Sequence, residues 1–580
     1  MPLRNPFPFQ TDAANCDHNR AEYKILTDGT KRPNCIWEDT TDAHLRITEE
    51  LALSPECRAF GDLRLAFSDA AEAVHHIVTT DEQFALEETD IRGITFRTFK
   101  NAPRHLREVM DLCLEYDQAD FLVFGEERRT YKDFYEETSR LADALASVYN
   151  IKKGDRVAIV MRNSPEYLVL MMAITSIGAV VVFLNSWWTT EELEYGFTDS
   201  GAKLAFVDQP RAETMQPFVE RMGIERVIVR ADAMPGTRSY SDLLALSSSR
   251  ELSAVNIHTD DDMAVMYTSG STGHPKGVVQ THRGAISAVM TWLMSARIAE
   301  EMDRLPEMPV GADGEPVQAC ALITTPLFHV SATHACFLVS LCAGAKIVLM
   351  HKWNPVEAID LIEREQATRF FGVPTMSADL MEAALELGKS LPTLRSLEAG
   401  GAKRPAAQVA KLADAMPHAQ PGTGFGMTET NGLGIGLRGE DYIARPGAAG
   451  RLYPPLQDLK IVDDNGDELP FGQVGELILK SPANMRCYLN KPEATAETLK
   501  DGWIYTGDLA TLEADGIVTI VDRKKDMIIR GGENISCLEI DAALHLHPAV
   551  SEAAVFSIPD ARLGEVVGAG VLLKAGSQLD

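Results

Sequence analysis

The sequence predicts an α/β protein with a large N-terminal domain followed by a small α+β domain. Strands alternate with helices in two separate stretches, which indicates two parallel sheets with covered faces. Hairpin signals beyond Gly450 indicate a small antiparallel β subdomain. A chain of 580 residues also exceeds the size of a single core. The large domain is therefore expected to hold two α/β subdomains and a small distorted β-barrel.

The first alternating stretch begins with an amphipathic helix over 128–150 and a strand over 155–161. Residues 167–184 are apolar for long enough to span a membrane, but Gly178 divides them. Ser164 and Pro165 precede the first half and are typical of a helix start. The second half is β-branched, as buried parallel strands are. We expect a buried helix and a buried strand here, and no transmembrane segment.

The later elements follow the same reasoning. A helix over 189–201 leads to the strand KLAFVD, and the second alternating stretch covers ACALITTPLFHV, AKIVLM, PVEAIDLIEREQ and TRFFGVP. Asn465-Gly466 and Asp515-Gly516 predict two hairpins in the β subdomain. The expected domains are an N-terminal extension of uncertain structure (1–105), a large domain (106–522) and a C-terminal domain (523–580).

Composition limits the functional classes. The net charge of −29 and a pI near 4.9 argue against a broad surface for nucleic acid or anionic membrane. Nine cysteines are scattered without a CxxC pair, which favours reduced thiols over disulfides or a zinc site. The first ten residues, MPLRNPFPFQ, show no apolar core of a signal peptide. We therefore expect a cytoplasmic protein that acts on small molecules; its oligomeric state is not indicated.

The segment YTSGSTGHPKG, residues 267–277, carries the clearest chemical signal. Its glycines let the backbone approach a ligand closely, its hydroxyls donate hydrogen bonds, and Lys276 adds a positive charge. Such a loop can wrap a polyphosphate, although a polar surface turn is the alternative. An ordinary P-loop is excluded because Pro275 and Gly277 flank the lysine. The flanking sequence predicts a strand before the loop and a helix after it.

Four further segments follow this loop in a recognisable order: PLFHV (326–330), GFGMTET (424–430), WIYTGDL (503–509) and DRKKDMIIRGGENI (522–535). With these five segments the chain, from about residue 106 to its end, resembles the adenylate-forming superfamily of acyl-CoA synthetases, peptide-synthetase adenylation domains and luciferases. It is most similar to bacterial fatty-acyl-CoA ligases. The resemblance implies an acid–thiol ligase that uses ATP, Mg²⁺ and coenzyme A. It would form an acyl-adenylate and then a thioester, releasing pyrophosphate and AMP.

The resemblance also implies roles in nucleotide binding. The loop residues Thr268, Ser269, Gly270, Ser271, Thr272, Gly273 and Lys276 would hold the β- and γ-phosphates. Thr428 would bind the α-phosphate and Glu429 would hold Mg²⁺, although a helix cap with its first-turn acid is the structural alternative. Asp508 and Arg523 would bind the ribose, unless Asp508 is only a turn residue. Phe425, between Gly424 and Gly426, would stack on adenine without the hydroxyl that tyrosine offers many relatives.

Other implied roles concern the acid and coenzyme A. His329 would orient the acyl carboxylate and gate the acyl channel, against the alternative of a buried structural histidine. Gly400, Gly401 and Ala402 would line the channel, or form a tight turn. Lys525 stands at the hinge position where many relatives carry aspartate, and Gly531 and Gly532 would line the pantetheine tunnel; a plain hairpin is the alternative.

The segment LNSWWTTEELEYGFTDSGAKLAFVD resembles bacterial fatty-acyl ligases more than amino-acid-activating domains, which implies a medium- or long-chain fatty acid as substrate. Asp379 falls within a predicted helix, unlike the pocket aspartate of amino-acid-activating domains. Aromatic or sterol-type acids remain alternatives, as do a nucleotide-binding pseudo-ligase without turnover and a kinase-like NTPase.

Relatives also carry a lysine near their C-terminal end, and the last lysine of this chain, Lys574, lies too early in the sequence to match it. We therefore expect a truncated form with impaired adenylation, unless only the given sequence is incomplete.

Overall fold

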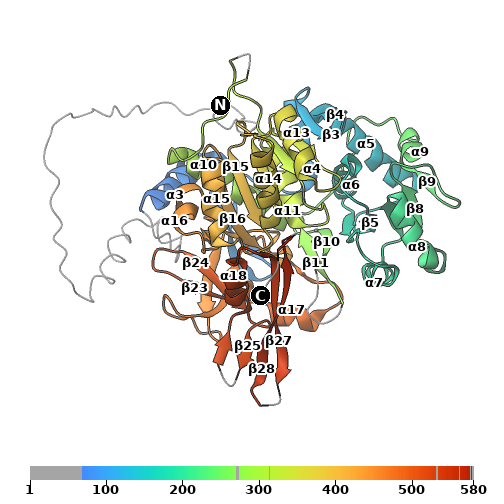
Figure 1. Ribbon diagram of the computed structural model, residues 1–580. Coiled ribbons are helices and arrows are strands. Elements are labelled where there is room, and N and C mark those ends of the chain that lie inside the picture. Colours follow the sequence, from blue (N-terminus) through green and yellow to red (C-terminus); the bar gives the residue numbers. More distant parts are fainter. Residues whose placement is uncertain are drawn as a thin grey trace. The chain divides into compact units, whose positions relative to one another are not determined.

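The computed structural model describes residues 68–268, 274–311, 314–530, 533–560, 562–574 and 576–577 (Figure 1). The described strands form sheets of two, eight, nine, five and four strands. Before the large sheets come α3 (Ser68–Thr80), the 3-10 turn Glu82–Phe84, the hairpin β1 (Leu86–Ile91) and β2 (Ile94–Phe99), and α4 (Leu106–Tyr116). The predicted α/β class, with a large domain and a small C-terminal domain, is confirmed.

The eight-stranded sheet has the order β21-β11-β10-β6-β5-β7-β8-β9. Its strands are β5 (Arg156–Val160), β6 (Val180–Phe183), β7 (Leu204–Val207), β8 (Glu225–Ile228), β9 (Arg238–Ser239), β10 (Asp262–Thr268), β11 (Lys276–Thr281) and β21 (Cys487–Tyr488). Its helices are α5 (Tyr131–Val148), α6 (Pro165–Ser176), α7 (Thr190–Ser200), α8 (Gln209–Met222) and α9 (Tyr240–Ala245). Every residue of α6 is buried, and β6 follows it, as the divided apolar segment predicts. Among the described helices, none is both long and apolar enough to cross a membrane.

The nine-stranded sheet has the order β18-β17-β16-β15-β14-β12-β13-β3-β4. Its strands are β3 (Asp120–Phe124), β4 (Glu127–Thr130), β12 (Cys320–Ile323), β13 (Lys346–Leu349), β14 (Arg369–Gly372), β15 (Ser396–Gly400), β16 (Gln420–Gly426), β17 (Gly434–Arg438) and β18 (Arg451–Leu452). The helices are α10 (His282–Glu301), α11 (Val330–Ala332), the π-helix Thr333–Leu338, α12 (Val339–Cys342), α13 (Pro355–Glu365), α14 (Pro374–Glu386), α15 (Ala406–Ala415), the 3-10 turn Thr428–Thr430 and α16 (Gly439–Ala444). Strands β12 to β16 are parallel, so their carboxyl ends meet at one edge.

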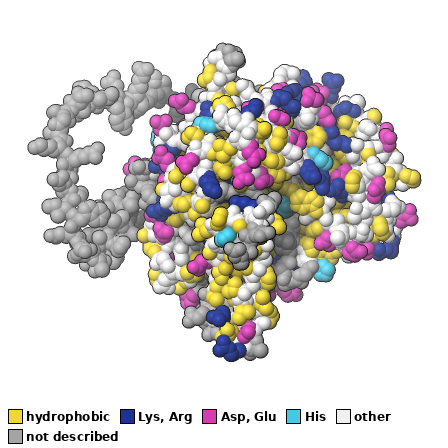
Figure 2. All heavy atoms as spheres, viewed as in Figure 1, with side chains coloured by type: hydrophobic (Ala, Val, Ile, Leu, Met, Phe, Trp, Pro, Cys, Tyr) yellow, Lys and Arg dark blue, Asp and Glu magenta, His cyan; other side chains and the backbone are white. Residues whose placement is uncertain are grey.

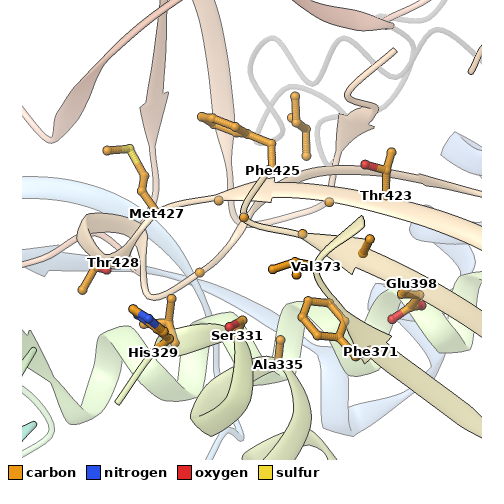
Figure 3. Close-up of a pocket in the computed structure, with 18 of the residues that line it drawn as sticks. His329, Ser331, Ala335, Phe371, Val373, Glu398, Thr423, Phe425, Met427 and Thr428 are labelled. Atoms are coloured by element: carbon orange, nitrogen blue, oxygen red, sulfur yellow. The ribbon is translucent and has the colours of Figure 1, made fainter. Parts of the chain in front are cut away.

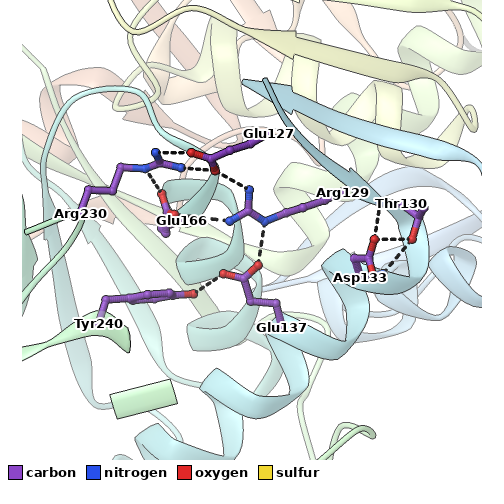
Figure 4. A network of polar contacts seen from close by, with 8 residues as sticks. All are labelled: Glu127, Arg129, Thr130, Asp133, Glu137, Glu166, Arg230 and Tyr240. Atoms are coloured by element: carbon purple, nitrogen blue, oxygen red, sulfur yellow. Dashed lines mark hydrogen bonds and ion pairs between the residues drawn. The ribbon is translucent and has the colours of Figure 1, made fainter. Parts of the chain in front are cut away.

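Polar side chains tie the two large sheets together (Figure 4). Arg230, which follows β8, bonds Glu127 at the start of β4 through two nitrogens at 2.7 Å each and Glu166 of α6 at 2.7 Å. Arg129 bonds Glu137 at 2.7 Å, and Glu137 accepts the Tyr240 hydroxyl at 2.9 Å. Arg129, Glu137 and Glu166 are largely buried between the sheets, where an unpaired ion would be costly, and the network pairs each of them.

The β subdomain contains β19 (Asp458–Val462), β20 (Gly475–Lys480), β22 (Leu499–Lys500), β23 (Trp503–Leu512) and β24 (Val518–Arg523), with α17 (Pro492–Thr498) between β21 and β22. The turns at Gly466 (φ 88°) and Gly516 (φ 81°) lie where the hairpins are predicted. The C-terminal elements are β25 (Ile528–Arg530), β26 (Glu533–Ile535), α18 (Cys537–His545), β27 (Val550–Asp560) and β28 (Gly564–Leu573). Phe556 and Ile558 of β27 are exposed apolar side chains. Figure 2 shows the face of the molecule on which hydrophobic and charged side chains are interspersed.

The predicted order of strand, loop and helix around Lys276 omits one strand, β11. Strand β11 intervenes before α10 and pairs antiparallel with β10, with Tyr267 opposite Gly277. Val278 and Val279 are β-branched and fully buried, so they belong to a sheet core instead of a helix start. The glycine-rich loop therefore joins the two strands of a hairpin, and Lys276 is the first residue of the returning strand.

Candidate active site

A cavity of about 1230 Å³ lies at the carboxyl ends of the parallel strands of the nine-stranded sheet and extends to the β subdomain (Figure 3). It brings together most of the site residues expected from the sequence: Thr268, Lys276, His329, Gly400, Gly401, Gly424, Phe425, Gly426, Thr428, Glu429, Asp508, Arg523 and Lys525. Ala402 is exposed and is not part of the cavity wall. The remaining predicted residues, Ser269, Gly270, Ser271, Thr272, Gly273, Gly531 and Gly532, lie outside the described residues.

Glycines shape the cavity wall where β15 and β16 end. Gly400 pairs with Gly424, and a Cβ on Gly400 would lie 3.2 Å from the Phe371 ring. A Cβ on Gly426 would run into the carbonyl of Gly432. Phe425 is half-buried beside the core of the β subdomain. Glycine is therefore required at Gly426, and nearly so at Gly400, because neighbouring atoms already fill the space that a side chain would take.

Lys276, Tyr488 and Glu429 form a connected group on the wall. The Lys276 Nζ lies 4.3 Å from the centre of the Tyr488 ring, a cation–π contact. The Tyr488 hydroxyl donates to Glu429 Oε1 at 2.6 Å, and Glu429 is only 6% exposed. Burial, together with the nearby Glu429 carboxylate, raises the pKa of Tyr488 well above its ordinary value. The Tyr488 hydroxyl therefore stays protonated, and its hydrogen bond orients the Glu429 carboxylate.

Thr428 and Glu429 are held next to β11 by the backbone. The Gln280 side chain of β11 donates to the Thr428 carbonyl at 3.1 Å, and the Met485 N–H donates to the Glu429 carbonyl at 2.7 Å. The predicted helix cap is a single 3-10 turn, and its cap position is Met427 instead of Thr428. Thr428 thus lines the cavity close to the end of the hairpin that carries Lys276.

Asp508 and Arg523 face each other across β23 and β24, with Arg523 Nε 3.5 Å from Asp508 Oδ1. Burial raises the pKa of Asp508 to about 6, although Arg523 opposes the shift. The preceding Gly507 has a φ of 75°, and its N–H donates to the Glu476 carboxylate at 3.0 Å. This turn directs Asp508 to the cavity, where its carboxylate can accept two hydroxyl hydrogen bonds.

His329 precedes α11, and its side chain makes no capping hydrogen bond. The ring is open to the cavity and lies 4.5 Å, centre to centre, from the Phe328 ring. Desolvation by its surroundings lowers the pKa of His329, so the ring is neutral at pH 7. Asp379 lies in α14, as predicted. It accepts a hydrogen bond from Trp353 Nε1 at 2.9 Å and is exposed outside the cavity wall.

Two groups of cavity residues were not predicted from the sequence. Tyr488 has no local signal, because β21 reaches the site only by pairing with β11, with Tyr488 opposite Val278. The other group is a set of polar side chains away from Thr428: Arg369, Ser396, Glu398, Gln420, Arg438 and Tyr453. They alternate with buried residues along the strands, and a period of two indicates a strand face without indicating what the face binds.

The residues present fit Mg²⁺ only as a partner of a bound polyphosphate. Glu429 offers one hard oxygen ligand at the cavity wall, near Lys276. Over the described ranges, no group of three or more histidine, cysteine, aspartate or glutamate side chains could hold a metal. Mg²⁺ is typically bound by one or two carboxylates together with phosphate oxygens and water, which agrees with a single glutamate.

The chain is similar to known proteins along most of its length. The model of the AMP-binding enzyme family matches residues 113–489, and that of the AMP-binding enzyme C-terminal domain matches residues 539–580. Feruloyl-CoA synthase of Amycolatopsis sp is 33% identical over 78% of this chain and 85% of that protein. Long-chain-fatty-acid–CoA ligase FadD13 of Mycobacterium tuberculosis is 32% identical over 77% and 83%. The structure of o-succinylbenzoate CoA synthetase from Bacillus subtilis with its acyl-adenylate intermediate has a TM-score of 0.69 and 26% identity, covering 81% of this chain and 89% of that one.

Proposed function

The chain belongs to the family of AMP-binding enzymes, and from this we propose that it joins a carboxylic acid to coenzyme A through an acyl-adenylate. The observation that carries the proposal is the convergence of Lys276, Thr428, Glu429 and Asp508 on one cavity, from three separate segments of the chain. The similar proteins are coenzyme A ligases for aromatic and fatty acids, which supports the same reaction class here.

In the first step a carboxylate oxygen attacks the α-phosphorus of ATP, and the bond to pyrophosphate breaks. Both reactants are anions, so the barrier is largely electrostatic and positional. Lys276 would neutralise charge on the departing phosphates, and the Thr428 hydroxyl would donate to the α-phosphate. Mg²⁺, held by Glu429 and phosphate oxygens, would supply further positive charge. The Tyr488 hydroxyl would hold Glu429 in place for this purpose.

The nucleoside would occupy the side of the cavity formed by β16, β23 and β24. Asp508 would accept the ribose hydroxyls with Arg523 beside it, and Phe425 would pack on adenine over the glycine-lined backbone. The neutral His329 ring would orient the acyl carboxylate by hydrogen bonding. Each of these side chains lines the cavity and is therefore accessible to a ligand there.

In the second step the coenzyme A thiol attacks the acyl carbon, and the bond to the AMP oxygen breaks. Lys525, which lines the cavity, would act as the hinge of a C-terminal domain that starts near residue 523. Gly531 and Gly532 would contact the pantetheine of coenzyme A. We place the reaction in the cytoplasm; the unpaired thiols of Cys113, Cys320 and Cys336 support a reducing location.

Two classes of carboxylic acid are candidates for the substrate. A medium- or long-chain fatty acid, expected from the sequence, is one candidate, and an aromatic acid is the other. Feruloyl-CoA synthase among the similar proteins supports the aromatic candidate, and the long-chain-fatty-acid ligase supports the first.

A product assay across acid classes tests the proposal. The purified protein should convert ATP to AMP and pyrophosphate only when an acid is present, and should form a thioester when coenzyme A is added. A kinase-like NTPase would instead form ADP, and a pseudo-ligase would bind ATP without forming either product. ADP formation, or the absence of any acid-dependent AMP, would overturn the assignment.

A further inference from the structure

The far part of the cavity lies on the face of three parallel strands whose residues are aligned in rows. Arg369, Ser396 and Gln420 form one row across β14, β15 and β16. Phe371, Glu398 and Gly422 form the next row, with Arg438 of β17 opposite Gly422. Gly400 and Gly424 form the row nearest Thr428. At about 3.3 Å per residue, the polar first row lies about 13 Å along the strands from the glycine row.

Arg369 and Glu398 are bonded to each other within this wall. Arg369 Nη2 and Nε donate to Glu398 Oε2 at 2.6 and 3.0 Å, and Nη1 donates to the Ala335 carbonyl at 3.1 Å. Both of these bonds end on Glu398 Oε2, and Ser396 adds a further side-chain hydrogen bond to the carboxylate. A carboxylate has about four acceptor sites and a guanidinium has five N–H donors, so both groups keep capacity for a ligand. Figure 3 shows Glu398 on the opposite side of the labelled residues from Thr428 and His329, with Phe371 between them.

The pair remains charged. Burial opposes ionisation of Glu398, but Arg369 and Arg438 outweigh it and keep the pKa of Glu398 below its ordinary value. Burial also raises the pKa of Tyr453, which lines the same part of the cavity and therefore carries a protonated hydroxyl. The wall thus combines one carboxylate, two guanidiniums and a phenol within reach of the far end of a bound acid.

A saturated acyl chain lying along these rows would remove water from the charged groups and offer no hydrogen bonds in return. Such desolvation without compensation is unfavourable. A distal carboxylate would be repelled by Glu398 as well as attracted by the arginines, and a distal ammonium would be repelled by the two arginines as well as attracted by Glu398. A hydroxyl can donate to Glu398 and accept from a guanidinium at the same time.

We propose that Arg369 and Glu398 make this enzyme selective for carboxylic acids that carry a hydroxyl group at the end remote from the carboxylate. The inference rests on the proposed ligase function and names the acid for its cavity. The hydroxyl belongs to an aromatic ring or to an alkyl chain, and the two sources are separable by substrate.

Two matched substrate pairs test the selectivity: 4-hydroxycinnamic against cinnamic acid, and 10-hydroxydecanoic against decanoic acid. Acid-dependent pyrophosphate release by the full chain gives kcat/KM for each. We expect the hydroxylated member of at least one pair to be favoured about 10- to 100-fold, the scale of a buried hydrogen bond to a charged group. The pair that shows the preference identifies the source of the hydroxyl.

Variants then assign the preference to the ion pair. Arg369→Leu with Glu398→Leu removes both charges and should abolish or reverse the preference. The control is Arg283→Leu with Asp260→Leu, which removes a similarly exposed bidentate pair outside the cavity wall and should leave the preference intact. If the first double variant does not fold, Glu398→Gln retains the side-chain volume and should still reduce the preference.

The outcomes separate the two proposals. If acids are adenylated but the hydroxyl changes kcat/KM less than twofold in both pairs, the selectivity is refuted while the ligase function stands. The same holds if the Arg369 and Glu398 variants keep the wild-type preference. If no acid yields AMP and pyrophosphate, the ligase function itself fails and the selectivity fails with it.

Discussion

Replacing Tyr488 by phenylalanine removes one hydroxyl from the proposed site and leaves the ring in place. The hydroxyl donates to Glu429 at 2.6 Å, and the ring contacts Lys276. Phenylalanine keeps the ring and its cation–π contact with Lys276, so the change isolates the hydrogen bond. We expect Tyr488→Phe to impair adenylation by loosening Glu429 without displacing Lys276.

The size of the effect follows from the burial of the acceptor. Glu429 is 6% exposed, so water replaces the lost donor poorly. A hydrogen bond to a charged group contributes about 1.5–3 kcal/mol, equivalent to about 10- to 150-fold in rate if the bond is needed in the transition state. Because Glu429 is proposed to hold Mg²⁺, the Mg²⁺ concentration for half-maximal activity should rise as well.

The assay is acid-dependent pyrophosphate release at varied ATP and Mg²⁺, with thermal unfolding measured in parallel. Tyr240→Phe is the matched control, because its hydroxyl also bonds a glutamate, Glu137, at 2.9 Å, but outside the cavity wall. The control should lose stability and keep wild-type kcat and Mg²⁺ dependence. Equal kinetics for the two variants would refute the role assigned to Tyr488.

Three further predictions follow from single groups of the site. Lys276→Ala should reduce kcat/KM for pyrophosphate release about 10²–10³-fold, since it removes a preorganised charge; unchanged steady-state kinetics would contradict this. Adenosine affinity should fall as the pH decreases through about 6, because protonated Asp508 accepts fewer hydrogen bonds from ribose; calorimetry from pH 5 to 8 should show this for the wild type and not for Asp508→Asn. Gly426→Ala should lower the free energy of unfolding by about 1–3 kcal/mol in urea titrations, because its Cβ meets the backbone of Gly432. Gly447→Ala, with open space around its Cβ, should be nearly neutral, and equal losses for both would contradict the argument.

Much of the fold could be predicted because its signals are local. The divided segment around Gly178 shows its helix and strand through capping residues and β-branching, and both are present. The Asn465-Gly466 and Asp515-Gly516 turns lie in the predicted hairpins because those residues accept the required backbone angles. Strand β11 was missed because a buried β-branched run of two valines next to a helix gives little periodicity to detect.

The residues of the candidate site also differ in whether their sequence signal is local. Segments such as GFGMTET and WIYTGDL carry their residues in short, ordered runs, so Thr428, Glu429 and Asp508 could be named from the sequence. Tyr488 and the Arg369–Glu398 pair depend on strand pairings between distant segments. Only the register shows that these side chains share the cavity, and a sequence period cannot supply the register.

The most direct test of the account is the fate of the oxygen atoms of the acid. With 4-hydroxycinnamic acid labelled with ¹⁸O in its carboxylate, ATP and coenzyme A, attack on the α-phosphorus followed by thiol attack on the acyl carbon leaves one acid oxygen on AMP. Mass spectrometry should therefore show AMP carrying one ¹⁸O and unlabelled pyrophosphate. Label in inorganic phosphate together with ADP, or unlabelled AMP accompanying thioester formation, would contradict the acyl-adenylate mechanism.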